Sequence, residues 1–502
     1  MTTRDTPSRP GAPLRAGAEV ELGFNDLLAN GQAVGRTGGM VVFCFGPLPQ
    51  ERARVRITTV KPKYAVGELL AITKKSTLRA TPFCPVFGKC GGCQIQHLNY
   101  HGQLAWKRDV VRSALARIGG FADPAVHDTI GMINPRNYRN KMSLVVDGRF
   151  PTPRIGFYQQ RTHDLVPIDA CPIVAPSLNS AIGRLNEARF NPQTAPAFEH
   201  LLHIVARSAR ATEQSVVTFT TAQPSEGVAT AATAMMKQLP NAVGLTNSFD
   251  LSSQNAIVGR KHRVVAGSPQ IEEQIAGVRY RVSAGSFFQV NVEIVGRIFE
   301  FMTRGLDVPR RIVDLYCGAG TFSLYFAKLG SEVYGIEENP HAVAEANENA
   351  ELNALTERVR FRPGRVEELV RQPEVRRALQ DAQIVFLDPP RKGADEATLE
   401  AIAEGGVPNV WYLSCDPATL ARDLKFLAAK GYRLGIVQPF DMFPQTGHVE
   451  TFVTLYREAD MHKHVLETAF KSAPMPRWPA DDEFARDRYS TEPSEYPEFV
   501  IR

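Results

Sequence analysis

The feature that most constrains the fold is a regular alternation of strands and helices after Arg311. Apolar runs such as "RIVDLYCGAG", "EVYGIE", "QIVFLDPP" and "NVWYLSCDP" end in glycine or polar residues, and helical stretches separate them. This alternation predicts an α/β fold with a parallel sheet covered by helices on both faces. The last two runs, "RLGIVQPF" and "ETFVTLYR", have no helix between them, which predicts an antiparallel hairpin.

The rest of the chain divides by composition. Its 502 residues are too many for one compact core. Residues 1–13 are rich in proline, which predicts a flexible N-terminus, and residues 458–502 lose the strand pattern, which predicts a mostly disordered tail. Residues 14–75 contain short strands broken by glycine pairs, and "RARVRITTV" alternates apolar residues with arginine. We expect a small β-barrel there, with a basic face that is either solvated or bound to RNA.

Charge and hydropathy exclude some classes of protein. No run approaches the roughly 20 apolar residues of a membrane helix, and the first residues have no apolar segment typical of a secretory signal. We therefore expect a cytoplasmic protein without membrane contacts. The formal net charge of +5 permits a polyanionic partner but does not require one.

The run "DLYCGAGTFSL" predicts a ligand pocket. It places Gly318 and Gly320 between a strand and a helix, where backbone N–H groups can approach a ligand closely. Glu337 ends the next strand and can accept both hydroxyls of a ribose. A tight turn without a ligand, a dinucleotide and S-adenosylmethionine are the alternatives. We favour S-adenosylmethionine, because the third glycine of the dinucleotide fingerprint is missing and because Asp388 and two prolines end the fourth strand.

Cys415 is the candidate nucleophile. It follows a strand and precedes Asp416 and Pro417, which predict a helix that begins just after the thiol. The amides and dipole at that helix end should lower the pKa of the thiol, and the charge of Asp416, if close, should act in the opposite direction. A buried structural cysteine is the alternative. We favour the nucleophile, because the end of this strand should face the same cleft as Gly318 and Asp388.

A thiolate is needed when the methyl acceptor is a weakly nucleophilic carbon, such as C5 of uracil. Addition of sulfur to C6 activates C5 for attack on a sulfonium methyl, and a base must then remove the C5 proton so that the thiolate can leave. The run "FPQTGHVETF" offers His448 and Glu450 as candidate bases. We favour the carboxylate and expect His448 to be a loop residue without a role in the reaction.

In their order along the chain, these motifs, together with "CPVFGKCGGCQ" and "SFFQVN", resemble the bacterial RNA (uracil-5-)-methyltransferases. The likeness is to the iron–sulfur-containing branch that acts on 23S rRNA, and it extends over about residues 14–456. It implies S-adenosylmethionine-dependent C5-methylation of a uridine, most simply in 23S rRNA. The T-loop uridine of tRNA is the alternative target, and we expect a monomer.

The resemblance also implies a division into three domains. Residues 14–75 should be a TRAM domain, an OB-like barrel that binds RNA. The other two are a small α+β central domain with a [4Fe–4S] cluster (76–102 and 126–280) and a Rossmann-like class I methyltransferase domain (103–125 and 281–457). The methyltransferase domain thus includes the run "QLAWKRDVVRSALARIGG". This run should form an amphipathic helix that stops at Gly119.

The resemblance implies roles for particular residues. Cys415 should be the nucleophile and Glu450 the proton acceptor. The expected cofactor contacts are Gln289, Tyr316, Gly318, Gly320, Thr321, Glu337 and Asp388. Arg365 stands where some relatives have an amide-bearing residue, so no adenine contact is assigned to it. Arg139 and Lys141 of "NYRNK" resemble the basic segment beside the flipped nucleotide, and two surface charges are the alternative.

The cysteine-rich run supplies three thiols, Cys84, Cys90 and Cys93, and leaves one ligand missing. Cys171 is the candidate for the fourth, because the remaining cysteines fall in the barrel, the glycine loop and the cleft. Four thiolates suit zinc and a [4Fe–4S] cluster equally, and the resemblance favours the cluster.

Two other classes of protein are disfavoured. A metal-containing RNA-binding module with an inactive methyltransferase fold would not need Cys415, Asp388 and Glu450 together. A radical enzyme would need cysteines spaced C-x3-C-x2-C, whereas this chain has C-x5-C-x2-C.

Overall fold

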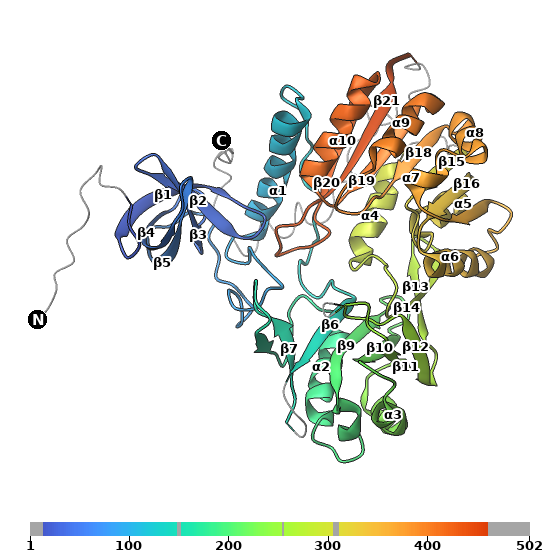
Figure 1. Cartoon of the computed structure of the whole chain (residues 1–502), viewed down its shortest axis with the longest axis horizontal. Coiled ribbons are helices and arrows are strands. Elements are labelled where there is room, and N and C mark those ends of the chain that lie inside the picture. Colours follow the sequence, from blue (N-terminus) through green and yellow to red (C-terminus); the bar gives the residue numbers. More distant parts are fainter. Residues whose placement is uncertain (1–13, 148–151, 254–255, 305–310, 460–502) are drawn as a thin grey trace, which may run out of the picture.

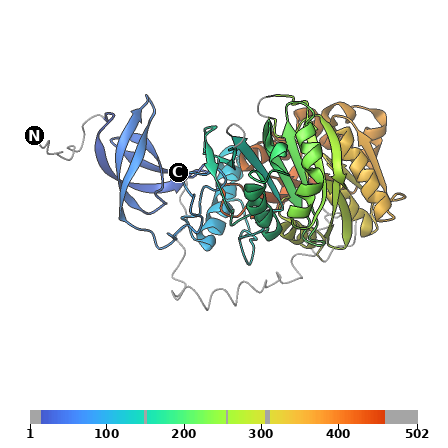
Figure 2. The same ribbon diagram turned by 90° about the horizontal axis from the view of Figure 1, so that it is seen from below.

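The structure is a computed structural model that describes residues 14–147, 152–253, 256–304 and 311–459. The predicted flexible N-terminus and nearly all of the predicted C-terminal tail lie outside these ranges. Across the described ranges, no helix has the length and apolar character needed to span a membrane. The barrel lies at one end of the molecule, and the two larger parts lie beside each other (Figures 1 and 2).

The N-terminal strands form a closed barrel, as predicted, in the order β1-β2-β3-β5-β4. Its strands are β1 (Glu19–Leu27), β2 (Gln32–Thr37), β3 (Met40–Phe45), β4 (Arg52–Val60) and β5 (Tyr64–Lys74).

The predicted alternation along β4 is confirmed, because its apolar side chains are buried and its arginines are exposed. Two of these arginines have acidic partners on β1: Arg52 contacts Glu21 at 3.2 Å, and Arg56 contacts Glu19 at 3.0 Å. The outer face is therefore less positive than β4 alone indicates.

The central part contains a seven-stranded sheet in the order β12-β11-β10-β9-β6-β7-β8. The helices α2 and α3 contribute apolar side chains to the core beneath it. The strands are β6 (Lys141–Asp147), β7 (Arg154–Tyr158), β8 (Leu165–Pro167), β9 (Leu201–Ser208), β10 (Ser215–Thr221), β11 (Ala242–Phe249) and β12 (Lys261–Gly267). The helices are α2 (Pro176–Ala188), the short 3-10 helix η2 (Ala195–Phe198) and α3 (Glu226–Gln238).

The C-terminal part confirms the predicted α/β fold. Its seven-stranded sheet has the order β17-β16-β15-β18-β19-β21-β20, and β21 runs antiparallel to both neighbours. The strands are β15 (Arg311–Leu315), β16 (Glu332–Glu337), β17 (Val359–Pro363), β18 (Ile384–Leu387), β19 (Asn409–Ser414), β20 (Tyr432–Phe440) and β21 (Glu450–Arg457). The helices are α4 (Val292–Thr303), α5 (Thr321–Lys328), α6 (Pro340–Leu352), α7 (Val366–Leu369), α8 (Pro373–Asp381), α9 (Glu396–Gly405) and α10 (Pro417–Ala429).

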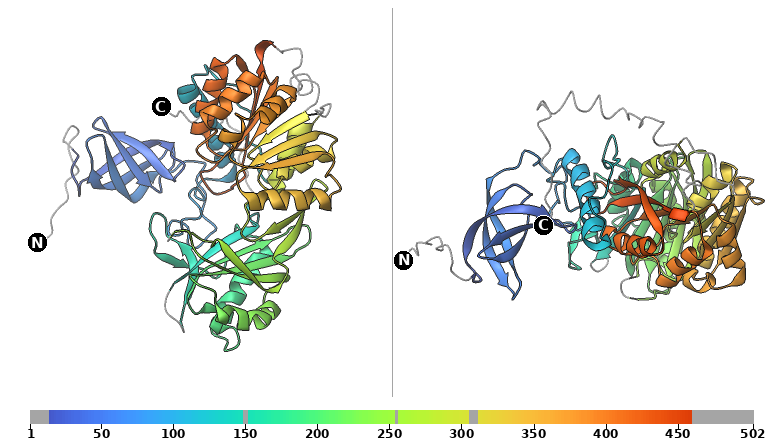
Figure 3. Two further views of the ribbon diagram at one scale, coloured as in Figure 1. Left: turned by 45° about the vertical axis from the view of Figure 1, so that its right-hand side comes forward. Right: turned by 90° about the horizontal axis from the view of Figure 1, so that it is seen from above.

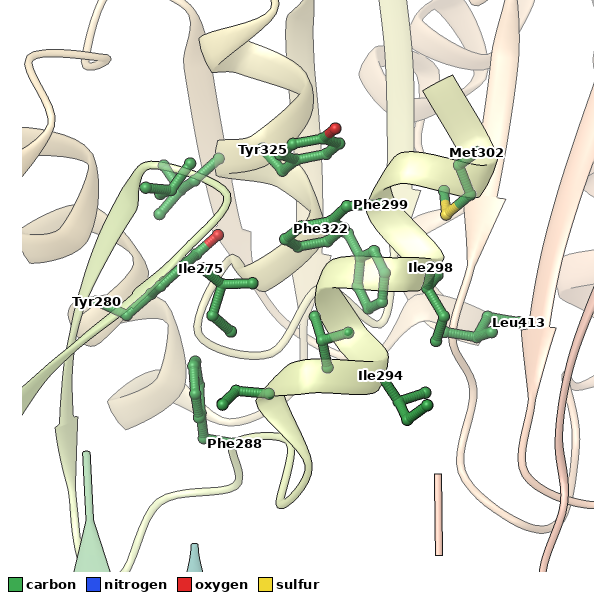
Figure 4. Packing of buried hydrophobic residues seen from close by; sticks show 14 of the residues in the cluster. Ile275, Tyr280, Phe288, Ile294, Ile298, Phe299, Met302, Phe322, Tyr325 and Leu413 are labelled. Atoms are coloured by element: carbon green, nitrogen blue, oxygen red, sulfur yellow. The ribbon is translucent and has the colours of Figure 1, made fainter. Parts of the chain in front are cut away.

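The hairpin of β13 (Gln270–Ile275) and β14 (Val278–Ser283) packs against α5 and α6. Figure 4 shows its side chains Ile275 and Tyr280 in one cluster with Phe288 and with side chains of α4 and α5. In this cluster, the rings of Phe299 and Tyr325 stack with centroids 4.0 Å apart. The hairpin thus shares its core with the C-terminal part, although the boundary expected at residue 280 assigned most of it to the central domain. Figure 3 shows it between the two parts.

The helix α1 (Tyr100–Ala114) and the π-helical segment η1 (Leu115–Gly119) pack against α10 (Figure 1). Val111 and Leu115 are buried in the same core as Leu420. The chain leaves the helix at Gly120, which has a positive φ of 74°, so the stop lies one residue beyond the predicted Gly119.

Candidate active site

Neighbouring strands bring the predicted reactive groups to one edge of the C-terminal sheet. Asp388 follows β18, Cys415 follows β19, and Glu450 is the first residue of β21. β19 pairs with both β18 and β21. Because β21 is antiparallel, its first residue lies at the edge where the parallel strands end. This edge is also where a sheet of this kind binds its ligands.

The two carboxyl groups lie in a poorly solvated environment. Glu450 is buried, and burial together with the charge of Asp388 raises its pKa well above the ordinary value. Asp388 is partly exposed as a residue, but its carboxyl group is enclosed, and this burial raises its pKa to about 7. Two coupled carboxyls of this kind do not both ionise easily, so one of them tends to keep a proton near neutral pH.

The thiol of Cys415 does not have the lowered pKa that the sequence predicts. Burial, followed by the charges of Glu450 and Asp388, raises its pKa to about 12, and the charge of Arg391 opposes this. The predicted effect of the helix was wrong for a structural reason. Asp416 accepts hydrogen bonds from the first free N–H groups of α10, those of residues 418 and 419, at 2.9 and 3.0 Å. These amides therefore bind Asp416.

Arg391 and His448 stand beside these groups. Nη2 of the exposed Arg391 lies 3.3 Å from Nε2 of His448. Burial and the positive charges of Arg391, Lys107 and Arg139 lower the pKa of His448 to about 4. Its ring is therefore neutral near pH 7 and a weaker base than Glu450. Arg391 was not predicted from the sequence, although its place three residues after Asp388 could have indicated it.

The glycine loop has the geometry of a ligand cradle. The N–H of Gly318 donates to Glu337 at 3.1 Å, and the N–H of Asn339 donates to the other oxygen of the same carboxylate at 2.9 Å. Gly318 has a φ of 56°, and no atom lies within 4 Å of where its Cβ would stand. Gly320 has a φ of 79°, and a Cβ there would meet the ring of Phe361 at 3.1 Å. The loop thus needs both glycines, and one of them faces open space.

Of the other expected cofactor residues, Tyr316 and Thr321 directly flank this loop, whereas the contact of Gln289 is with Asn140. Tyr316 has a positive φ of 68°, and its hydroxyl lies 3.4 Å from that of Thr398. The carbonyl of Thr321 accepts from the hydroxyl of Tyr280 at 2.9 Å, at the start of α5. The carbonyl of Gln289 accepts from the side chain of Asn140 at 3.2 Å.

Asp314 was not predicted from the sequence. It is buried on β15, and one of its carboxyl oxygens accepts from Ser323. Its other oxygen is buried and has no hydrogen-bond partner among the residues that the structure describes. Burial raises its pKa to about 8, and Asp388 and Glu337 act in the same direction. An unsatisfied buried oxygen beside an open glycine loop fits a polar ligand at this edge.

The predicted RNA residues lie beside this site. Nε of Arg139 donates to the carbonyl of Lys141 at 3.0 Å. Lys141 and Arg207 both donate to the carbonyl of Ser286, at 3.4 and 2.9 Å. Phe287 follows, and its side chain is among the most exposed aromatic groups described, at 76%. Sequence reasoning missed it, although it lies in the quoted run "SFFQVN".

The four predicted metal ligands are brought near one another. Burial raises the pKa of Cys93 to about 12, and the thiols of Cys171, Cys90 and Cys84 act on it in the same direction. The donor set is chemically suited to an iron–sulfur cluster or zinc. Within the described ranges, however, no three or more His, Cys, Asp or Glu side chains are arranged closely enough to hold a metal ion.

Comparison with known proteins decides the family. The family described as tRNA (Uracil-5-)-methyltransferase matches residues 157–458, and the TRAM domain matches residues 13–70. The chain belongs to this methyltransferase family. It is 38% identical over 450 residues to an uncharacterized RNA methyltransferase of Thermosynechococcus vestitus, with 88% of this chain and 98% of the relative covered. It is 35% identical over 476 residues to an uncharacterized RNA methyltransferase of Bacillus cereus, with 91% and 99% covered.

A solved structure of the family has the same architecture. The tRNA (uracil-54, C5)-methyltransferase of Pyrococcus abyssi, in complex with S-adenosyl-L-homocysteine, superposes with a TM-score of 0.67 at 26% identity. The match covers 86% of this chain and all of that one. The protein is thus an RNA (uracil-5-)-methyltransferase with an N-terminal TRAM barrel, and its C-terminal sheet has the fold of an S-adenosylmethionine-dependent methyltransferase.

Proposed function

We propose that the protein methylates C5 of a specific uridine in RNA, with Cys415 as the nucleophile and Glu450 as the base. The convergence of Cys415, Asp388 and Glu450 on one sheet edge is the observation that carries this proposal. Methylation of a weakly nucleophilic ring carbon needs both a nucleophile and a base.

The reaction divides into two half-reactions at these groups. The thiol of Cys415 gives its proton to solvent, the thiolate Sγ forms a bond to C6 of the uracil, and the electrons of the C5=C6 bond move onto C5 and O4. After C5 has been methylated, Glu450 takes the C5 proton. The electrons of that C–H bond restore C5=C6, and the C6–S bond breaks to release the thiolate. The raised pKa of Glu450 suits a carboxylate that accepts a proton from carbon and later returns it to water.

We propose that S-adenosylmethionine occupies the glycine loop, where Gly318, Gly320, Glu337, Asp388 and Asp314 form the polar surface. The bound cofactor supplies the sulfonium methyl that C5 attacks. The complex of the P. abyssi relative with S-adenosyl-L-homocysteine supports this choice of cofactor. Gln289, Tyr316 and Thr321 are proposed as further contacts.

We propose 23S rRNA as the substrate, because the cysteine-rich run resembles the branch that modifies it. A tRNA T-loop uridine is the second candidate, because the P. abyssi relative is a tRNA (uracil-54, C5)-methyltransferase. To decide, the purified protein is given rRNA and tRNA from a strain that lacks the gene, and 5-methyluridine is located in each. Methylation of one uridine in 23S rRNA is expected. Methylation of tRNA alone would reassign the substrate, and methylation of neither would contradict the proposal.

We propose that Cys84, Cys90, Cys93 and Cys171 hold a [4Fe–4S] cluster, with zinc as the alternative. The mutual effect of these thiols on Cys93 supports a shared site. Such a cluster has all its protein ligand positions filled, so it would stabilise the fold and take no part in methyl transfer. Protein purified without air should be brown and contain iron and sulfide. A colourless protein that contains zinc would favour the alternative.

A further inference from the structure

The loop between β20 and β21, residues 441–449, leads directly to Glu450 and is mostly buried. Residues far away in the sequence hold it. Within the loop, Gln445 forms several hydrogen bonds with such residues, and it is only 3% exposed. The loop leads into Glu450, whose backbone also pairs with Phe440 of β20, so the bonds that hold the loop contribute to the placement of Glu450.

Gln103 on α1 forms a reciprocal pair with Gln445. Its side-chain NH2 group donates to the side-chain oxygen of Gln445 at 2.9 Å, and the backbone N–H of Gln445 donates to the side-chain oxygen of Gln103 at 3.0 Å. Gln103 is 1% exposed, so both bonds are shielded from water. Its NH2 group also donates to the carbonyls of Ile95 and Leu98, at 3.2 and 2.8 Å. An amide side chain suits this position, because its oxygen accepts while its NH2 group donates more than one hydrogen bond.

The backbone carbonyl of Gln445 is also occupied. It accepts from the N–H groups of Gln94 and Ile95, each at 3.1 Å. These residues directly follow the third cysteine of the cysteine-rich run, Cys93. Gln103 therefore joins both this segment and the loop to one helix.

Other contacts fix the remainder of the loop without using Gln103. Lys107, one turn further along α1, forms a fully buried ion pair with Asp441 and donates to the carbonyl of Phe443 at 3.1 Å. The hydroxyl of Tyr138 donates to the carbonyl of Pro444 at 3.1 Å. The second half of the loop, next to Glu450, also has the contact of His448 with Arg391 and the close approach of Gly447 to the barrel. Loss of the pair between Gln103 and Gln445 should loosen this half without freeing it.

We infer that Gln103 is a positioning residue for Glu450 and acts on it through Gln445. The inference rests on the proposed function, because it takes Glu450 as the base. Cys415 is placed independently at the end of β19, without the loop. Displacing Glu450 should therefore slow removal of the C5 proton and leave addition of the thiolate and methyl transfer largely intact.

The test separates the two half-reactions. Gln103→Leu is mixed with S-adenosylmethionine and with rRNA and tRNA from a strain that lacks the gene. Methyl transfer and covalent protein–RNA adduct are followed in a single turnover. Release of the methylated RNA should slow by about tenfold to a hundredfold, the loss that a small displacement of a reacting group causes. The adduct should accumulate, while methyl transfer changes little.

A matched control separates positioning from loss of stability. Tyr432→Phe removes a buried hydrogen bond, 2.7 Å to the carbonyl of Val407, at the far end of β20. Both variants are assayed at the same interval below their own melting temperatures. Adduct in Gln103→Leu but not in Tyr432→Phe supports the inference. Equal slowing of both steps in Gln103→Leu, without adduct, overturns it.

Two further variants keep the outcome decisive. Gln445→Met keeps the length of the side chain but loses its amide, and it should show the same accumulation of adduct. If Gln103→Leu and Gln445→Met both fail to fold, the pair is structural and the inference is overturned. Glu450→Gln is the reference. If it accumulates adduct and the Gln103 variant does not, the inference alone fails, whereas absence of adduct in Glu450→Gln contradicts the proposed function.

Discussion

The carboxyl groups of Asp388 and Glu450 interact in an enclosed site, so the stability of the folded protein should depend on pH. The pKa of Asp388 is raised from 3.8 to about 7, so the folded protein binds a proton there more tightly than the unfolded chain. The stability from this proton is fully present below the unfolded pKa and is lost as the pH rises through about 7. Between pH 3.8 and about 7, the melting temperature of the ligand-free protein should fall as the pH rises. This fall should be absent from Asp388→Asn. Equal pH dependence in both proteins would contradict it.

Glu450→Gln should stop the reaction after methyl transfer, because the amide cannot accept the C5 proton and the thiolate cannot then leave. The expected product is a protein–RNA adduct that survives a denaturing gel. The matched control is the double variant Cys415→Ala with Glu450→Gln, which lacks the sulfur that forms the adduct. A gel-stable adduct in the double variant, or none in Glu450→Gln, would show that these roles are wrong.

The sequence was sufficient to predict that Cys415, Asp388 and Glu450 lie at one edge of the sheet but not their protonation. Cys415 and Glu450 flank strands, and strand ends can be recognised from hydrophobic patterns. The pKa of the thiol was predicted in the wrong direction, because it depends on burial and on the carboxyls of other strands. The sequence predicted that Asp416 caps the helix and opposes its effect on the thiol, and the structure shows its carboxylate bound to the first free amides of α10.

At the scale of single elements, the start of α5 depends on two glycines that differ in their surroundings. Gly320→Ala combines a positive φ with a contact of 3.1 Å to the ring of Phe361 and should cost about 1–3 kcal/mol of stability. Gly318→Ala meets no atom within 4 Å. It should lower the affinity for S-adenosylmethionine with a smaller loss of stability. Melting temperatures and calorimetric binding measure the two effects, and the reverse order would contradict these roles of the two glycines.

Elements were predicted unequally well from the sequence. The strands of the C-terminal sheet are apolar and separated by amphipathic helices, so both type and order followed from the pattern. The central sheet was not predicted, because its strands carry no regular alternation with helices and its pairing joins segments far apart, such as β6 with β9. The place of α1 in the methyltransferase domain came only from the family resemblance, and its packing on α10 only from the structure, since periodicity defines an apolar face but not its partner.

At the scale of the whole molecule, the barrel meets the C-terminal part at the loop before Glu450. A Cβ on Gly447 would stand 1.9 Å from the carbonyl oxygen of Ala29, and Nε1 of Trp106 donates to the carbonyl of Leu27 at 3.0 Å. The barrel is therefore in direct contact with the loop that leads to the proposed base.

Gly447→Ala should force the barrel and this loop apart. We expect RNA methylation to fall by about tenfold or more, because a small displacement at a reactive site has effects of this size. The affinity for S-adenosylmethionine should be unchanged. Gly183→Ala is the control, because its Cβ would meet no atom within 4 Å on α2. Equal activity of the two variants would show that barrel contact does not influence the reaction.

Release of tritium from RNA labelled at C5 of uridine tests covalent methylation at C5 most directly. With S-adenosylmethionine present, the protein should release tritium to water in step with methyl incorporation. Cys415→Ala should lose both by about a thousandfold or more, while Cys44→Ala, which changes a buried thiol of the barrel, should keep both. Methyl incorporation without tritium release, or release that continues in Cys415→Ala, would contradict this mechanism.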